Sequence, residues 1–266
     1  MNKKTKKNGN SLPFKLYKHP GVQFFVGLLL LFVLVGFVEK RQREKLPQKL
    51  HVEINPLGKL KFVNHDDVQF MLENSISGQL KNNKVRDLNF KALEKTLIES
   101  DYIADAEIYA DYSGNVFADI YQRKPIMRMV NRKQKSFYVD ELGHKFPLSY
   151  RFAAKVPVFN GYFDEAESYE ALESEEAWQA LEMAKQIRAS ALLKSVVGQV
   201  YLDKNGAVFI FSRIGKHKVE LGHLNQSLNG QLDKLSVFYK EINRTGKWSD
   251  FKNVNLKYDN QIIIKK

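Results

Sequence analysis

The chain has 266 residues, a formal net charge of +12 at pH 7 and no cysteine. The missing cysteines exclude disulfides, thiolate metal sites and cysteine nucleophiles. Most of the positive charge lies in residues 1–50, and the other 216 residues carry a net charge of only +3. This distribution argues against nucleic acid as the ligand of the larger part of the chain, because DNA binding needs an extended positive field.

An uncharged segment, residues 21–38, predicts a transmembrane helix. Fourteen of its eighteen residues are Leu, Phe or Val. A helix of this length spans about 27 Å, close to the ~30 Å hydrocarbon layer of a bilayer. A buried core helix would be amphipathic, whereas this segment is apolar all round. Charged residues follow it where a signal peptide would have a small-residue cleavage site, so we interpret it as an uncleaved anchor.

The residues on either side of this span predict its orientation. Residues 1–20 contain six lysines, and residues 39–50 contain five lysines or arginines. The positive-inside rule counts such residues, so by this narrow difference it favours a short cytoplasmic tail over residues 1–20 and a large external part. Residues 39–50 are charged and include Pro47, which predicts a juxtamembrane stalk rather than a longer helix.

Residues 51–124 predict an α+β domain with the order strand, helix, helix, strand, strand. Apolar and polar residues alternate over 50–55, as in a strand with one buried face. Asn64 and Asn89 are the predicted caps of the two helices, and Ser113–Asn115 is the predicted turn between the last two strands. This order places two helices on one face of a sheet.

Residues 125–266 predict a second, mixed α/β domain. The helical spacing of apolar residues predicts long helices over 174–192 and 226–243, and Lys204–Gly206 predicts a hairpin turn. We expect the last strand of the chain to be an edge strand, since no later segment follows to cover it. The predicted strands cover residues 126–130, 136–140, 196–202, 207–211, 218–221 and 253–264.

No motif for catalysis or metal binding is present, so we expect neither an enzyme nor a cofactor. The sequence lacks G-x-S-x-G, H-E-x-x-H, the P-loop and G-x-G-x-x-G. We interpret His217 and His223 as exposed loop residues rather than a ligand pair. Asp66 and Asp67 are interpreted as residues of a helix start, where the helix dipole favours them, rather than as an acid–base pair.

Six short segments have an order and spacing that resemble a known family: Ile103–Ile108, Tyr121–Ile126, Tyr138–Gly143, Val156–Gly161, Leu221–Gly222 and Val254–Asp259. Together with a basic tail and a single anchor, they resemble the FtsQ/DivIB family of bacterial cell division proteins over nearly the whole chain. The sequence departs from the family pattern at Gln122, Asn255 and Lys257, where glutamate, aspartate and arginine are usual. Lys257 keeps the positive charge but lacks the planar fork of arginine.

The resemblance implies a topology and a location. The expected parts are a cytoplasmic tail (1–20), a transmembrane helix (21–38), a stalk (39–50), a POTRA domain (51–124) and an FtsQ-type β domain (125–266) that ends in the edge strand. The protein is expected in the inner, cytoplasmic membrane at the division septum. Its N-terminus would lie in the cytoplasm and its main domain in the periplasm or outside the cell.

The resemblance also implies a function without catalysis. Such proteins are divisome scaffolds that bind FtsB and FtsL and help to recruit and control septal peptidoglycan synthesis, and other divisome members dock on the POTRA domain. The partner adds a strand beside the last strand of the second domain. Tyr258 would either contact the partner or, as the alternative, pack on the helix over 226–243. The expected partner-binding residues are Tyr258 first, Lys257 second, and Leu256, Asn260 and Ile262.

Two other functions stay open at this point. An anchored cell-wall enzyme would show a cleft with convergent acids or a nucleophile. A POTRA-bearing component of transport or of a chaperone would carry several POTRA units in tandem.

Overall fold

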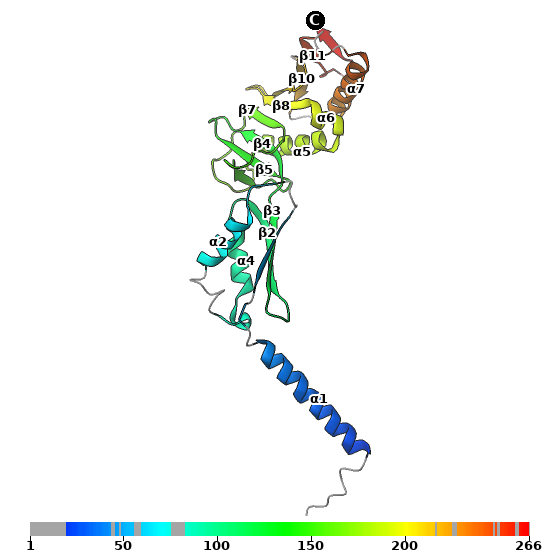
Figure 1. Ribbon diagram of the computed structural model, residues 1–266. Coiled ribbons are helices and arrows are strands. Elements are labelled where there is room, and N and C mark those ends of the chain that lie inside the picture. The colour runs from blue at the N-terminus through cyan, green and yellow to red at the C-terminus, as the bar shows by residue number, and fades with distance from the viewer. Residues whose placement is uncertain are drawn as a thin grey trace, which may run out of the picture.

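The computed structural model describes residues 20–43, 46–47, 49–55, 60–75, 83–215, 217–224, 228–246, 248, 251–258 and 261–265. Figure 1 shows three parts that follow one another along the chain. Helix α1 (Pro20–Arg43) is followed by a small sheet with its own helices, and then by a larger sheet that includes the C-terminal residues.

Helix α1 is a separate rod of 24 residues at the N-terminal end of Figure 1. Large apolar side chains on it are exposed, including Phe24 at 69%, Leu29 at 67% and Phe32 at 74%. Among the residues that the structure describes, none forms a helix with both the length and the apolar character that crossing a membrane requires. The helix forms where we predicted one, but the transmembrane span predicted over residues 21–38 is not confirmed.

The small sheet has the predicted order of elements. Its strands run β1-β3-β2, with β1 parallel and β2 antiparallel to β3. Apolar side chains of both helices, such as Val68 and Leu93, join the sheet residue Ile120 in one buried core. The bounds are β1 (Leu50–Asn55), α2 (His65–Ser75), η2 (Val85–Asp87), α4 (Phe90–Ile98), β2 (Ile103–Ala110) and β3 (Val116–Gln122).

Both predicted helix caps are confirmed. The backbone N–H of Asp67 donates to Oδ1 of Asn64 at 2.8 Å, and the N–H of Asn64 donates back to Oδ2 of Asp67 at 2.9 Å. This reciprocal pair satisfies two N–H groups that a helix start leaves unpaired. Asn89 accepts from the N–H of Ala92 in the same way at the start of α4. Asp67 therefore belongs to a helix start, as the sequence indicated.

The large sheet has nine strands in the order β12-β11-β10-β9-β8-β7-β4-β5-β6. Helices α5 (Glu175–Ala189), α6 (Ala191–Val196) and α7 (Asn229–Thr245) contact the sheet, and their buried side chains join those of the strands in one core. The strands are β4 (Pro125–Val130), β5 (Ser136–Asp140), β6 (Lys145–Pro147), β7 (Val158–Gly161), β8 (Val197–Leu202), β9 (Ala207–Ser212), β10 (Lys218–His223), β11 (Asn253–Asn255) and β12 (Ile263–Lys265).

One predicted helix is two helices in the structure. The helix expected over 174–192 ends at Ala189, and α6 begins at Ala191. Ser190 between them has an extended backbone, and its hydroxyl accepts a hydrogen bond from the N–H of Leu193 at 3.3 Å. Apolar residues keep helical spacing across this break, so the pattern concealed it, although serine is a preferred N-cap residue.

The C-terminal strand was predicted wrongly. Instead of one strand over 253–264, the chain forms β11 and then β12, which folds back antiparallel on β11 with Val254 opposite Ile264. Strand β11 is therefore interior, between β10 and β12, and β12 is the edge. The alternation after Val254 and the apolar residues at 262–264 suggested one continuous strand. The Asp259-Asn260 pair between them is, however, of the residue types that favour turns.

His217 is buried rather than exposed, which corrects the interpretation made from sequence. Only 1% of its surface is accessible, and its Nε2 lies 3.0 Å from the hydroxyl of Tyr239 in α7. Burial lowers the pKa of His217 below its ordinary value and raises the pKa of Tyr239 to about 12. The pair is therefore neutral at pH 7 and joins α7 to the start of β10.

This lowered pKa predicts acid sensitivity of the large domain. As the pH falls below about 6.5, the unfolded chain takes up the proton at His217 before the folded chain does, so stability falls by up to about 1.4 kcal/mol per pH unit until the lower folded pKa is reached. His217→Gln keeps a polar partner for Tyr239 but cannot titrate. Urea unfolding at pH 7.5 and 5.5 should show a larger loss for the unchanged chain than for this variant. Equal losses would contradict the assignment.

Gln122, the last residue of β3, fixes the segment that leads into α2. Its Oε1 accepts from the N–H groups of Phe62 at 2.9 Å and Val63 at 3.2 Å, while its Nε2 donates to the carbonyl of Leu60 at 3.2 Å. A glutamate would accept the first two hydrogen bonds but, when ionised, has no donor for the third. The glutamine found here in place of the usual glutamate fits this local geometry.

Aromatic packing and an ion pair connect the two sheets. Phe62 contacts the rings of Tyr102, Tyr138, Phe146 and Phe152, with centroids 5.1–5.7 Å apart. Several of these side chains form a third buried cluster between the sheets. Directly after Gln122, Nη1 of Arg123 lies 2.8 Å from Oδ2 of Asp140 in β5. The two sheets therefore share a packed junction.

Candidate partner-binding edge

Strand β12 is an exposed apolar edge. It is the outermost strand of the large sheet, and no strand in the described part of the chain pairs with its outer side. Ile263 and Ile264 are 40% and 42% exposed, and the preceding Ile262 is 36% exposed. Proteins usually protect such edges with charges or proline, because unpaired backbone N–H and C=O groups attract other strands. Lys265 is the one charged residue of β12, and the exposed isoleucines before it leave most of this edge apolar, which indicates an interaction surface.

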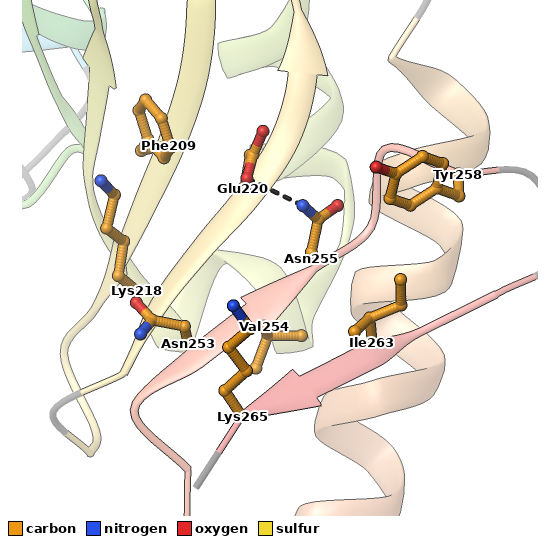
Figure 2. A pocket seen from close by; sticks show the side chains of 9 residues that line it. All are labelled: Phe209, Lys218, Glu220, Asn253, Val254, Asn255, Tyr258, Ile263 and Lys265. Atoms are coloured by element: carbon orange, nitrogen blue, oxygen red, sulfur yellow. Dashed lines mark hydrogen bonds between the residues drawn. The ribbon is translucent and has the colours of Figure 1, made fainter.

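A groove of about 330 Å³ lies next to this edge. Lys218 and Glu220 of β10 line it and alternate with the buried residues Val219 and Leu221, so the groove lies on the sheet face opposite the core. Figure 2 shows the side chains around it, from β9 across β10 and β11 to β12. The lining residues are Phe209, Lys218, Glu220, Asn253, Val254, Asn255, Tyr258, Ile263 and Lys265.

Strand register explains why side chains from distant parts of the sequence meet here. Phe209, Glu220, Asn255 and Ile263 stand opposite one another on four neighbouring strands. Nδ2 of Asn255 donates to Oε2 of Glu220 at 2.8 Å, the dashed line in Figure 2. Such cross-strand pairs stabilise sheets. A strand added beside β12 would continue this row, and its side chain would contact Ile263.

The segment after β11 is fixed to helix α7. Nζ of Lys234 donates to the carbonyls of Leu256 at 2.5 Å and Tyr258 at 2.8 Å. Nζ of Lys257 lies 3.6 Å from Oε1 of Glu220 and 5.0 Å from the centre of the Tyr258 ring. The side chain of Tyr258 and the carboxylate of Glu220 raise the pKa of Lys257. Lys257 is therefore positively charged at neutral pH, beside the groove.

The five residues expected from sequence differ in their accessibility in the structure. Tyr258 is 48% exposed, so about half of its side chain is accessible next to the groove. The side chain of Lys257 is 40% exposed, and Ile262 is also exposed. Leu256 is a correction: it is fully buried in the core, so its side chain is not accessible to a partner. Asn260 lies outside the described residues.

Sequence reasoning named only Tyr258 among the nine residues that line this groove and missed the other eight. Ile263 and Lys265 belong to the edge strand, and Phe209 comes from β9, over forty residues earlier. The apolar run of Ile262–Ile264 was a usable signal for the first. No pattern in the sequence indicated Phe209, because its position beside the groove depends on strand pairing. In the described part of the chain no group of three or more His, Asp or Glu side chains could hold a metal ion.

Two family comparisons agree with this architecture. Residues 46–121 match the POTRA-like domain, and residues 124–264 match the family described as FtsQ/DivIB, C-terminal related. No curated protein matched the chain.

The fold and the first match define a POTRA-bearing protein with a second, mixed α/β domain. The second match covers more than half of the sequence, and the chain belongs to the FtsQ/DivIB family. Membership makes it a division-related scaffold with protein partners in the divisome. Members of this family are membrane proteins of the division site. FtsQ/DivIB and POTRA domains are typically non-enzymatic.

Proposed function

We propose that this protein captures an FtsB-like partner by strand addition to β12 and, in a complex that also contains an FtsL-like protein, helps to recruit and control septal peptidoglycan synthesis. The observation that carries the proposal is the exposed aliphatic edge of β12 beside the groove. A partner strand would satisfy the outer backbone groups of β12 and cover Ile263 and Ile264 at the same time.

The energy of such binding comes from side chains as well as from the backbone. Strand β12 has three residues, and each new backbone hydrogen bond contributes roughly 0.5–1.5 kcal/mol. A short strand therefore gives a few kcal/mol, and contacts with the isoleucines and with Tyr258 supply the remainder. Aromatic residues at interfaces are frequent hot spots. Lys257 offers a positive charge at the same place for an acidic residue of the partner.

Anchoring of both proteins in one membrane would raise their effective concentration, so that modest intrinsic affinity suffices. We propose that α1 is this anchor, with residues 1–20 in the cytoplasm and the two domains outside. The support is the exposed apolar surface of α1, from Phe24 to Val35. A patch of this kind is rarely left in contact with water, and a helix satisfies its own backbone groups inside a bilayer.

Tyr258→Ala tests the groove. We expect the affinity for the external segment of the FtsB-like protein to fall roughly 30-fold, the equivalent of about 2 kcal/mol for a hot-spot aromatic residue. Tyr169→Ala is the matched control, since Tyr169 has nearly the same exposure, 47% against 48%, and lies before α5, away from the groove. Affinity is measured by interferometry on the full chain in detergent, with circular dichroism as the test of folding.

Equal affinities of the two tyrosine variants would contradict the role of Tyr258. Photo-crosslinking in cells from position 264 then identifies what lies against β12. Capture of the FtsB-like protein supports the proposal. Capture of other proteins in its place would show that the partner at β12 is not the FtsB-like protein.

A further inference from the structure

A second groove lies at the junction of the two domains, far along the chain from β12. Its volume is about 670 Å³, a size typical of ligand-binding clefts. Leu60 comes from the POTRA side of the junction, while Pro125 begins the large sheet and Phe152 and Val156 come from the loop before β7. The apolar floor of the groove therefore contains residues of both domains.

The rim of this groove is positively charged. Lys124, Lys155, Arg188 and Lys194 all line it, and no aspartate or glutamate does so. None of the four has a side-chain salt bridge with a described residue, whereas Lys135, Lys185 and Lys257 elsewhere on the surface have one. Four unpaired cations around one cleft create a positive potential that attracts anionic groups.

We propose that this junction groove binds an acidic peptide segment of a partner protein, which inserts an apolar side chain between Phe152 and Leu60 while its carboxylates meet the four cations. Charge complementarity selects the acidic segment, and the apolar floor requires a side chain that a free phosphate or a simple anion does not have. This site is separate from the β12 edge and does not depend on the function proposed for that edge.

The position of the groove argues against a lipid headgroup as its occupant. Strand β1 begins at Leu50, on the side of α1, and ends at Asn55, toward the loop that contains Leu60. A strand of six residues is about 20 Å long. Figure 1 shows the small sheet between α1 and the large sheet. The groove is at the junction of the two sheets, so the small sheet separates it from α1. A protein segment reaches this position more readily than a bilayer surface does.

Binding here would also affect the junction. The ring of Phe152 contacts Phe62, with centroids 5.1 Å apart, within the aromatic cluster that joins the two sheets. A ligand that contacts both Leu60 and Phe152 is bound by the two domains together, so it binds best when they are docked. The same segment would then favour the docked arrangement of the domains.

The test uses the full chain in nanodiscs of neutral lipid. The probe is a fluorescein-labelled ten-residue peptide of alternating glutamate and leucine with one central phenylalanine, and its analogue has glutamine in place of every glutamate. We expect the double variant Lys155→Glu/Lys194→Glu to weaken binding of the acidic peptide at least tenfold. Lys133→Glu/Lys204→Glu, which makes the same charge change at two exposed turns, should alter it less than twofold.

Further measurements distinguish between the possible occupants of the groove. Binding of the neutral analogue should be at least tenfold weaker than that of the acidic peptide, and Tyr258→Ala should leave both unchanged. Equal effects of the two charge-reversal variants would overturn the proposal, as would equal affinity for the two peptides. Nanodiscs with phosphatidylglycerol that block the groove against the peptide would overturn it in favour of a lipid headgroup.

Discussion

Lys145→Met is expected to destabilise the large domain by about 3–5 kcal/mol, the cost typical of leaving one partner of a buried ion pair without the other. Nζ of Lys145 lies 3.2 Å from Oε2 of Glu165, and both side chains are inaccessible to solvent. Methionine fills a similar volume, but it offers no hydrogen bond to the carboxylate. The Glu165 carboxylate would then lie in the core with its main counter-charge removed.

The environment of Glu165 shows which part of the domain is affected. Its Oε1 accepts from the backbone N–H of Ser174 at 2.7 Å and from the hydroxyl of the same residue at 2.8 Å. Ser174 is the N-cap of α5. The ion pair thus connects strand β6 with the start of the helix, where the helix dipole favours a negative charge. Loss of Lys145 should loosen this helix start first.

Urea unfolding of the full chain in detergent, followed by tryptophan fluorescence, measures the effect. Trp178 lies in the first turns of α5 and donates to the carbonyl of Leu172 at 3.1 Å, so it reports on this region. Lys135→Met is the control: its ion pair with Glu167 is 3.8 Å long and largely exposed, and such pairs contribute at most about 1 kcal/mol. Equal losses in the two lysine variants would refute the assignment of a buried pair.

The features predicted correctly from sequence are those that depend on neighbouring residues. Asn64 and Asn89 cap helices through residues three positions away. Gly206 has a positive φ of 83° in the predicted turn between β8 and β9. The left-handed conformation explains why glycine stands at this position. Local hydrogen bonds and backbone preference suffice for such features.

The features that the sequence did not reveal depend on pairing between distant segments. Leu256 was expected at the surface because of its place in a motif, yet the position of β11 beside β10 puts it in the core. Nothing in the sequence distinguishes Lys145 from an ordinary surface lysine, because its buried ion pair with Glu165 depends on the fold. Phe209 joins the groove only through strand register. Burial and register are properties of the whole sheet, which one sequence does not specify.

Removal of residues 261–266 is expected to abolish capture of the FtsB-like partner, a loss of roughly 10- to 1,000-fold if about three backbone hydrogen bonds are lost. This truncation is cleaner than one that begins at residue 253, because Val254 and Leu256 belong to the core and must stay. Unchanged circular dichroism is the control for folding. Capture that survives the truncation would show that β12 is not the binding strand.

An engineered disulfide between β11 and β12 tests how the partner binds this edge. The partner either pairs with the outer side of β12 or displaces β12 and pairs with β11. Asn253 and Lys265 are directly opposite each other on these two strands, at a spacing that suits a disulfide. The chain has no cysteine of its own, so Asn253→Cys/Lys265→Cys forms a single defined link.

We expect this linked variant to bind with unchanged affinity in its oxidised form, because the outer side of β12 is already free of described strands and needs no displacement. Interferometry before and after reduction compares the two states of one protein, so folding and concentration are matched. Binding that appears only after reduction would mean that β12 leaves β11 to admit the partner. In that case β12 would act as a cover for the edge of β11, and the truncation of residues 261–266 should increase capture instead of abolishing it.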